Sequence, residues 1–414
     1  MRPKSISWTA CGTSAELNRQ ELKDENKMAI PLSYNVRNLR LRKSLTIMTA
    51  LGIALTVATA VFIMALLAGL GRAFATTGDP LNVLMLRKGS DSELAAGGVS
   101  RDAFQVLKEL PGIARNSKGE PLVSGEDILV VVLPRKGGTG ETNVTTRFMS
   151  PMGLEMRPQI HITQGRWFTP GQREVVVSSS INKRFEHANI GDSVHIGKGE
   201  WPIVGIFDGS GTAHDSEIWG DVNQLVTEFE RTVYSSVLVR ATDPAAAQAL
   251  KNRANDDQRL ELNGVLEPDY YASQTKSGGP IKFVGWIVAF IMAVGSCFAA
   301  ANTMYAAVAY RGREIATLRV IGFSRPSILT SFMLESLLLS LLGATLGIIL
   351  MLPFNGMTTG TQNQVTFSEV VFSLQMTPAV IGIAVLFALI MGVVGGFAPA
   401  WHASRRDILS ALRD

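Results

Sequence analysis

Four long stretches of the chain are almost free of charged side chains. They run from Leu45 to Leu70, from Phe283 to Ala309, from Ser327 to Pro353 and from Ala379 to Trp401, and only the third holds a charged residue, Glu335. A helix rises about 1.5 Å per residue, so about 20 apolar residues cross the roughly 30 Å hydrocarbon core of a bilayer. Backbone groups in lipid need partners within the segment, which favours helices. The pattern predicts four transmembrane helices.

Between the first and second stretches the pattern changes to short apolar runs separated by Gly, Pro and Asp. Runs rich in β-branched residues predict strands, and Ser100 is placed to cap a helix. The segment is therefore expected to be an α+β domain of one or two subdomains, with a mobile loop at Gly137, Gly138 and Gly140. The predicted strands cover 81–86, 128–133, 174–178, 193–196, 202–207 and 236–239, and the predicted helices cover 100–110, 180–188 and 244–252.

These patterns divide the whole chain. A polar leader over 1–27 is expected to precede the first domain, and Met28 is an alternative start. The basic amphipathic segment 28–44 is predicted either as an interfacial helix or as a simple basic flank. The remaining predicted segments are transmembrane helices over 45–71, 283–309, 327–353 and 379–401, an extracytoplasmic domain over 72–282, a loop over 310–326, an extracytoplasmic loop over 354–378 and a tail over 402–414.

Basic residues cluster beside some ends of the apolar stretches and not beside others. The loop over 354–378 contains no Lys or Arg. Lys and Arg favour the cytoplasmic side of short flanks, so both termini and the 310–326 loop are expected to be cytoplasmic. The flanking basic residues are Arg37, Arg40, Arg42 and Lys43, then Arg311, Arg313, Arg319 and Arg325, then Arg405, Arg406 and Arg413.

Composition agrees with a membrane protein. Charged residues make up 18% of the chain, against about 25% in soluble proteins. The net charge of +4 comes from the flanks, because residues 73–281 hold more acidic than basic side chains. We therefore expect contact with anionic lipid and none with nucleic acid. The two cysteines, Cys11 and Cys297, lie outside 72–282, so that domain is expected to fold without disulfides.

The chain shows no pattern typical of catalysis. The histidines of the predicted 72–282 domain, at 161, 187, 195 and 214, lack the spacing of a zinc site. The segment His214–Glu217 is predicted to be a solvated loop. There is no G-x-S-x-G motif and no G-x-x-x-x-G-K-[ST] motif. We therefore expect a non-catalytic chain without cofactor or metal, and any ATP and Mg²⁺ would be held by another polypeptide.

The segments around the third stretch form a recognisable pattern. Residues 311–325 read R-G-R-E-I-A-T-L-R-V-I-G-F-S-R, residues 335–337 read E-S-L, and residues 399–406 read P-A-W-H-A-S-R-R before A-L-R at 411–413. With one span, a large domain and then three spans, the chain resembles the MacB/FtsX-type ABC-transporter permeases over residues 28–414. G-R-W-F at 165–168, and G-D-S-V at 191–194 with V-G-I at 204–206, are similar to the extracytoplasmic domain of that family.

The resemblance implies a mechanism and partners. A homodimer or closely related heterodimer of permeases would pair with two copies of an ABC ATPase subunit in a bacterial inner membrane. Closure of the ATPases would push the loop between the second and third helices, and the motion would reach the extracytoplasmic domain, with a periplasmic adaptor as a further partner. The implied coupling residues are Arg311, Arg313, Glu314, Arg319, Gly322, Phe323, Ser324 and Arg325.

Local patterns in this region make further predictions. Arg311 and Glu314 are spaced to pair on a helix that Gly322 would end, and Ser324 before Pro326 would start the next helix. Glu335 is expected to face the bundle interior, with Asn302, Thr303 and Tyr305 as candidate partners. Its role is packing and orientation, or alternatively proton relay. Gly343 and Gly347 form G-x-x-x-G, which predicts either a dimer seam or packing within the chain.

The expected function is therefore that of the permease subunit of an ABC transporter, which couples ATP hydrolysis by a separate ATPase to work in export or envelope transport. The alternative is a regulatory scaffold that activates an envelope hydrolase without transport. A membrane-anchored enzyme would need a metal or nucleophile site, which the sequence does not indicate.

Overall fold

The computed structural model describes residues 37, 39, 41, 43–95, 97–138, 140–274, 279–362 and 368–405. The chain divides into two compact units. We call residues 66–282 with 355–375 the sheet unit, and the described residues of 1–65, 283–354 and 376–414 the helical unit. The predicted leader, most of the segment 28–44 and the tail after Arg405 lie outside the described residues.

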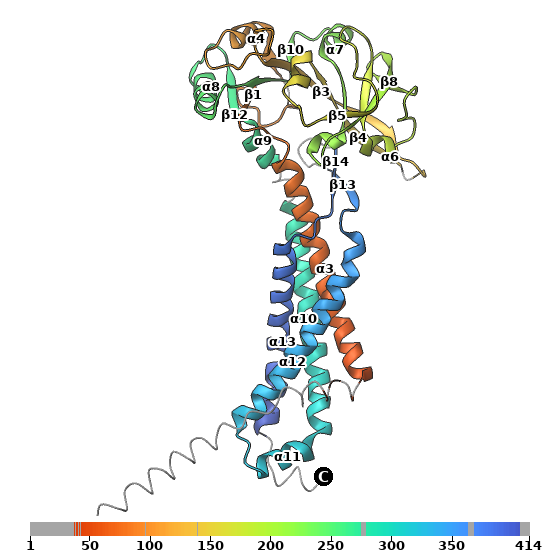
Figure 1. The fold of residues 1–414 in the computed structure, drawn as a ribbon, viewed down its shortest axis with the longest axis vertical. Coiled ribbons are helices and arrows are strands. Elements are labelled where there is room, and N and C mark those ends of the chain that lie inside the picture. The colour runs from red at the N-terminus through yellow and green to blue at the C-terminus, as the bar shows by residue number, and fades with distance from the viewer. Residues whose placement is uncertain are drawn as a thin grey trace, which may run out of the picture. The chain divides into compact units, whose positions relative to one another are not determined.

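Long apolar helices dominate the helical unit, where they run side by side (Figure 1). Each contains a segment long and apolar enough to cross a membrane. This confirms the predicted fold class of four transmembrane helices with a large α+β domain between the first and second. The helices are α3 (Lys43–Ala75), α10 (Gly279–Tyr310), α12 (Arg325–Met351) and α13 (Pro378–Arg405), with the shorter α11 (Gly312–Val320) and η4 (Leu352–Phe354).

Small residues let these helices approach closely. A Cβ atom added at Gly343 would lie 2.6 Å from Cγ2 of Ile53, and one at Gly347 would lie 2.6 Å from the carbonyl oxygen of Ala54, both on α3. On the other side of α12, the Ser336 hydroxyl donates a 2.7 Å hydrogen bond to the carbonyl oxygen of Gly392 on α13. Gly343 and Gly347 thus pack against α3 within the chain, while the predicted dimer seam stays a prediction.

The contact at Gly347 makes a testable prediction. Gly347→Ala is expected to lower the free energy of unfolding by about 1–3 kcal/mol, because the added methyl group meets the α3 backbone, which cannot rotate away. Gly382→Ala on α13 is the matched control, because its added Cβ would have no atom within 4 Å. The control should be neutral or gain up to about 1 kcal/mol from helix propensity. Unfolding by SDS in mixed micelles measures both, and equal midpoints would contradict the packing role.

A mixed sheet of ten strands forms the centre of the sheet unit, in the order β12-β1-β11-β3-β4-β9-β6-β8-β5, with β7 paired to β8. Only the pairs β4–β9 and β6–β8 are parallel. The strands of this sheet are β1 (Asn82–Arg87), β3 (Val123–Pro134), β4 (Glu141–Met149), β5 (His161–Gly165), β6 (Val175–Ser178), β7 (Ser193–Ile196), β8 (Gly199–Asp208), β9 (Glu217–Asp221), β11 (Ser236–Arg240) and β12 (Leu262–Leu266).

Shorter elements complete the sheet unit. The Ser100 hydroxyl accepts a 3.1 Å hydrogen bond from the Ala103 amide and caps α4, as predicted. The carboxylate of Asp243 caps α8 in the same way. The remaining elements are α4 (Arg101–Lys108), α5 (Pro151–Glu155), α6 (Ser179–Arg184), η2 (Ala213–Ser216), α7 (Val222–Phe229), α8 (Pro244–Asp256), α9 (Glu267–Gln274), and the strand pairs β2 (Val99–Ser100) with β10 (Val233–Tyr234) and β13 (Thr358–Gln362) with β14 (Glu369–Ser373).

Several buried hydrophobic clusters pack on this one sheet, and two of them are the largest. Phe148, Trp201 and Phe185 are buried in the first, while Val83, Leu107 and Val239 are buried in the second. The sheet runs without a break from β12 to β5, so the two halves form one unit. Gly137, Gly138 and Gly140 lie in the turn between β3 and β4, each with positive φ; the mobility of this turn stays a prediction.

The G-R-W-F segment packs at one edge of the sheet. Phe168 is buried, and the Trp167 ring stacks on Phe207 with ring centroids 6.2 Å apart. Arg166 forms a two-pronged contact with the carboxylate of Glu174, which also accepts a hydrogen bond from the Thr169 amide. The hydrogen bonds from Arg166 lower the pKa of Glu174 to about 2. The segment is thus built to hold a turn against the sheet.

Candidate coupling site

The turn after α11 separates two helices at predicted positions. Gly322 has φ +111°, a conformation that glycine adopts readily, and its amide donates to the Arg319 carbonyl while the Phe323 amide donates to the Leu318 carbonyl at 3.0 Å. This is the Schellman arrangement that ends a helix. The Ser324 hydroxyl then accepts from the Ser327 amide at 3.4 Å and begins α12. The predicted helix-break-helix is confirmed.

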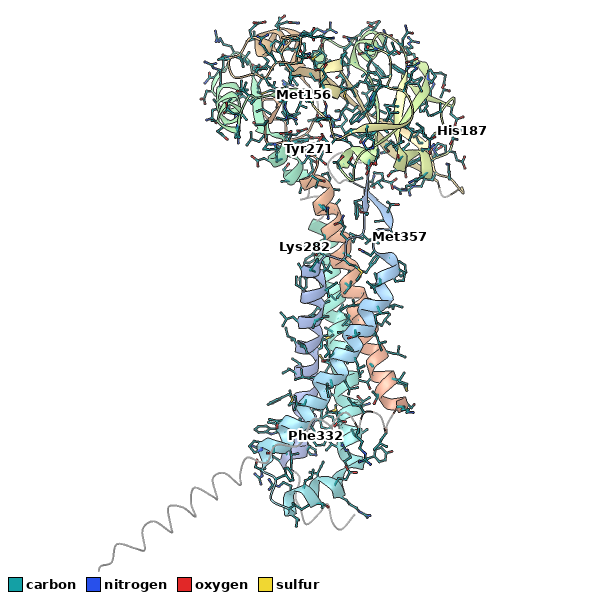
Figure 2. The ribbon with its side chains drawn as sticks, viewed as in Figure 1. Met156, His187, Tyr271, Lys282, Phe332 and Met357 are labelled. Atoms are coloured by element: carbon teal, nitrogen blue, oxygen red, sulfur yellow. The ribbon has the colours of Figure 1, made fainter. Side chains whose placement is uncertain are left out.

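One face of α11 packs into the helical unit. Ile315 and Ala316 are buried. Ile315 belongs to an apolar cluster with Val308 of α10, Phe332 of α12 and Ala403 of α13. Phe332 is labelled on α12 in Figure 2. Because Ile315 shares this cluster with residues of three membrane helices, α11 packs on the helical unit.

A buried ion pair joins the start of α11 to α12. Arg311 and Glu335 are 4% and 5% exposed, and Nη1 of Arg311 lies 2.8 Å from Oε2 of Glu335. Nε of Arg311 also lies 3.3 Å from Oε2 of Glu314, as the spacing predicted. The guanidinium stands over the Phe332 ring, 5.5 Å from its centroid. One arginine thus contacts both helices.

The predicted partners of Glu335 were wrong. Asn302 is exposed, the Thr303 hydroxyl donates to the carbonyls of Ala299 and Ala300, and the Tyr305 ring packs against His402. The α11 helix folds back on the bundle and brings Arg311 to the carboxylate instead. A carboxylate in a membrane helix is costly unless it is paired, and breaking such a buried pair costs about 3–5 kcal/mol. The pair therefore fixes α11 to α12.

The other face of α11 and its end are exposed. Arg313, Glu314 and Arg325 lie at the surface, and Arg319, Phe323 and Ser324 are half-buried around Gly322. Val320 and Ile321 are 65% and 61% exposed. Large apolar side chains rimmed by charged ones are typical of a surface that binds another protein. We call Arg313, Val320, Ile321 and Arg325 the α11 tip.

A second cluster of buried charges, in the sheet unit, was not predicted from the sequence. Arg147 on β4 is 3% exposed and contacts three buried carboxylates. Its guanidinium lies 2.7 Å from Glu126, 3.0 Å from Glu93 and 3.0 Å from Glu217. Arg157 makes a two-pronged contact with Glu126. We call Arg147 and its three carboxylates the Arg147 cluster.

Electrostatics favour the charged forms of two carboxylates in this cluster, Glu217 and Glu126. Burial raises the pKa of Glu217, but Arg147 and His214 outweigh it and hold that pKa well below the ordinary value. Burial likewise raises the pKa of Glu126, and Arg157 and Arg147 together lower it. Glu267 instead accepts hydrogen bonds from the Asp79 amide and the Asn82 side chain, and burial raises its pKa. The buried arginines therefore stabilise the charged forms of Glu126 and Glu217.

The prediction that His214–Glu217 forms a solvated loop was wrong. His214 and Ser216 are buried in η2, and Glu217 is buried at the start of β9. Nδ1 of His214 lies 2.9 Å from Oε2 of Glu217, and its ring packs against Trp219 and Tyr271, the latter labelled in Figure 2. Among the described residues, no three His, Cys, Asp or Glu side chains are placed to hold a metal ion.

Comparison with known proteins gives two family matches. Residues 46–257 match the model of the MacB-like periplasmic core domain, and residues 286–408 match the FtsX-like permease C-terminal model. These two matches cover the sheet unit for the most part and the last three membrane helices.

Named relatives align with a large part of this chain. The "Macrolide export ATP-binding/permease protein MacB" of Nitrosomonas europaea is 25% identical over 90% of this chain and 57% of its own length. The "Uncharacterized ABC transporter permease YknZ" of Bacillus subtilis is 26% identical over 61% of this chain and 66% of its own length. The solved extracellular domain of a YknZ transporter aligns with 44% of this chain at 18% identity and a TM-score of 0.32. The chain spans about half the length of the macrolide-export relatives.

Proposed function

The chain belongs to the MacB/FtsX-type family of ABC-transporter permeases, and from this premise we propose that it couples ATP hydrolysis by a separate ATPase to work in its extracytoplasmic domain. In this proposal the α11 tip faces the cytoplasm and docks on the ATPase. The sheet unit is the extracytoplasmic domain, and the output is export or envelope transport across a bacterial inner membrane.

The attachment of α11 carries the proposal. A surface that receives force must be fixed to the element that moves, and α11 is fixed to α12 by the Arg311–Glu335 pair and by the packing of Ile315. A push on the exposed tip would therefore displace α12 as well, and the coupling would not be absorbed by a flexible loop. The basic residues Arg313 and Arg325 suit an acidic patch on the ATPase.

The proposal includes an assembly. Two permease chains, identical or closely related, would join two ATPase subunits, which hold ATP and Mg²⁺. A periplasmic adaptor is a further proposed partner, as the family resemblance implies. Binding of such an adaptor favours export, and binding of an envelope hydrolase favours the regulatory alternative.

A loop replacement tests the coupling. Exchanging residues 319–325 for a Gly/Ser linker removes Val320, Ile321 and Arg325 from the tip. Membrane insertion should persist, while stimulation of the partner ATPase should fall to the rate of the ATPase alone, because the tip and the start of α12 are lost. ATP hydrolysis by the complex in nanodiscs measures this. A Gly/Ser exchange of the exposed turn 117–119 is the control, and unchanged stimulation in the 319–325 variant would remove the proposal.

A further inference from the structure

The connection between α12 and α13 is a strand pair that belongs to the sheet unit. β13 and β14 pair antiparallel, with Thr358 opposite Ser373 and Gln362 opposite Glu369. β14 is buried: Val370 and Phe372 pack in an apolar cluster with Phe74, Leu238 and Tyr271. A hairpin that only linked two membrane helices would have no need of a buried strand. We call β13 and β14 the α12–α13 hairpin.

Glu369 holds this hairpin by its charge. It is 5% exposed and contacts two arginines from different parts of the sheet unit. Nη2 of Arg135, in the turn after β3, lies 2.6 Å from Oε2, and Arg184 at the end of α6 contacts Oε1. Arg135 is itself oriented by a 2.9 Å hydrogen bond to the Thr142 hydroxyl. One carboxylate thus joins three elements.

Further contacts complete the attachment. The Val371 amide donates to the Ser216 hydroxyl at 2.6 Å, next to the Arg147 cluster. Arg72, near the end of α3, donates to the Gln375 side chain at 2.8 Å. The carbonyl of Ser373 lies so close to Gly69 of α3 that any side chain there would collide with it. A cavity of about 60 Å³ beside Arg147 has Glu369 and Val370 in its wall.

The helix before the hairpin is the one that carries the coupling site. α12 begins at the turn after the α11 tip and holds Glu335, the partner of Arg311. Its 27 residues span about 40 Å at about 1.5 Å per residue. One continuous helix therefore leads from the ATPase-facing tip to the chain segment that Glu369 fastens.

We propose that Glu369 is a positioning residue that fastens the α12–α13 hairpin to the extracytoplasmic domain, so that displacement of α12 reaches this domain through the hairpin. This inference rests on the proposed function and deepens it. Without the Glu369 contacts, α12 would still move when the tip is pushed, but the hairpin would slip against the domain. ATP hydrolysis would then continue, but the extracytoplasmic domain would no longer respond to it.

The test uses the full chain with its ATPase in nanodiscs, in a background where both native cysteines are replaced, Cys11→Ser and Cys297→Ser. Spin labels at Lys118→Cys, an exposed position of the sheet unit, report the ATP-dependent change in distance between the two domains of the dimer. In Glu369→Gln we expect stimulated ATPase activity within twofold of the parent, while the distance change falls by at least half. Arg184→Gln should act in the same direction. Glu141→Gln, an exposed carboxylate beside the same turn, is the matched control.

A second readout needs no ATPase. Hydrogen exchange of the Val370 and Phe372 amides should accelerate at least tenfold in Glu369→Gln and stay unchanged in Glu141→Gln. Unchanged exchange, or an unchanged distance response in Glu369→Gln, would overturn the anchor. If the parent chain itself shows neither ATPase stimulation nor a response to ATP, the proposed function fails, and hydrogen exchange still decides whether Glu369 fastens the hairpin.

Discussion

Arg311→Met is expected to destabilise the protein by about 3–5 kcal/mol and to abolish stimulation of the partner ATPase. The substitution leaves Glu335 buried in a membrane helix without its cation, whose Nη1 lies 2.8 Å away in the parent. SDS unfolding measures the stability, and ATP hydrolysis by the complex measures the coupling. Arg313→Ala is the control for stability, since its side chain is exposed on the same helix. Arg313→Ala should change the free energy of unfolding by no more than about 0.5 kcal/mol.

A double variant separates burial from coupling. Arg311→Met with Glu335→Leu removes both charges, which in other proteins is often neutral for stability. We expect the unfolding midpoint to recover, because no charge is left unpaired. ATPase stimulation should recover only in part, because α11 then keeps its apolar packing but loses its polar contact with α12. Full recovery of stimulation would mean that the ion pair only compensates for the cost of burying its two charges and contributes nothing to coupling.

Arg147→Met should be the most damaging single substitution in the sheet unit. It leaves Glu93, Glu126 and Glu217 buried together, and mutual repulsion adds to their desolvation. We expect a loss of at least about 3–5 kcal/mol, with the sheet unit unfolded at ordinary temperature. Protease resistance and tryptophan fluorescence of the full chain report this, because Trp201 and Trp219 are buried in that unit.

Two further variants make the Arg147 prediction specific. Arg259→Met removes an arginine that is 89% exposed and pairs with Asp257, so the stability of the protein should change little. Arg147→Lys keeps the charge, but an ammonium lacks the planar guanidinium that contacts all three carboxylates. We therefore expect an intermediate loss of stability. Similar stability of Arg147→Met and Arg259→Met would contradict the structural role of the Arg147 cluster.

The features that could be predicted from the sequence are those determined by residues close together along the chain. The membrane helices follow from the length and apolarity of four stretches. The end of α11 follows from the backbone freedom of Gly322, and the start of α12 follows from the side chain of Ser324, which caps it. The same holds for the Ser100 cap. Such signals need no knowledge of the rest of the chain.

The features that were missed depend on residues far apart. β4 reads E-T-N-V-T-T-R-F-M, and so many polar residues give no pattern typical of a buried strand. Arg147 therefore looks like a surface arginine until β9 is placed beside β4. Glu335 was correctly singled out, but its partner lies 24 residues away and is reached only because α11 folds back. Glu369 and Arg135 are 234 residues apart, and one sequence holds no signal for such a pair.

The membership of residues 355–375 in the sheet unit bears on how a water-soluble form of that unit could be produced. A fragment cut at residues 66 and 282 would omit β14 and leave the apolar surface around Leu84, Leu238 and Tyr271 bare, a liability for aggregation. A fragment that carries residues 355–375 on an added linker would restore this cover. Secreting the two fragments in parallel would compare them, and the fragment with residues 355–375 would then be the material for crystallisation and ligand screening.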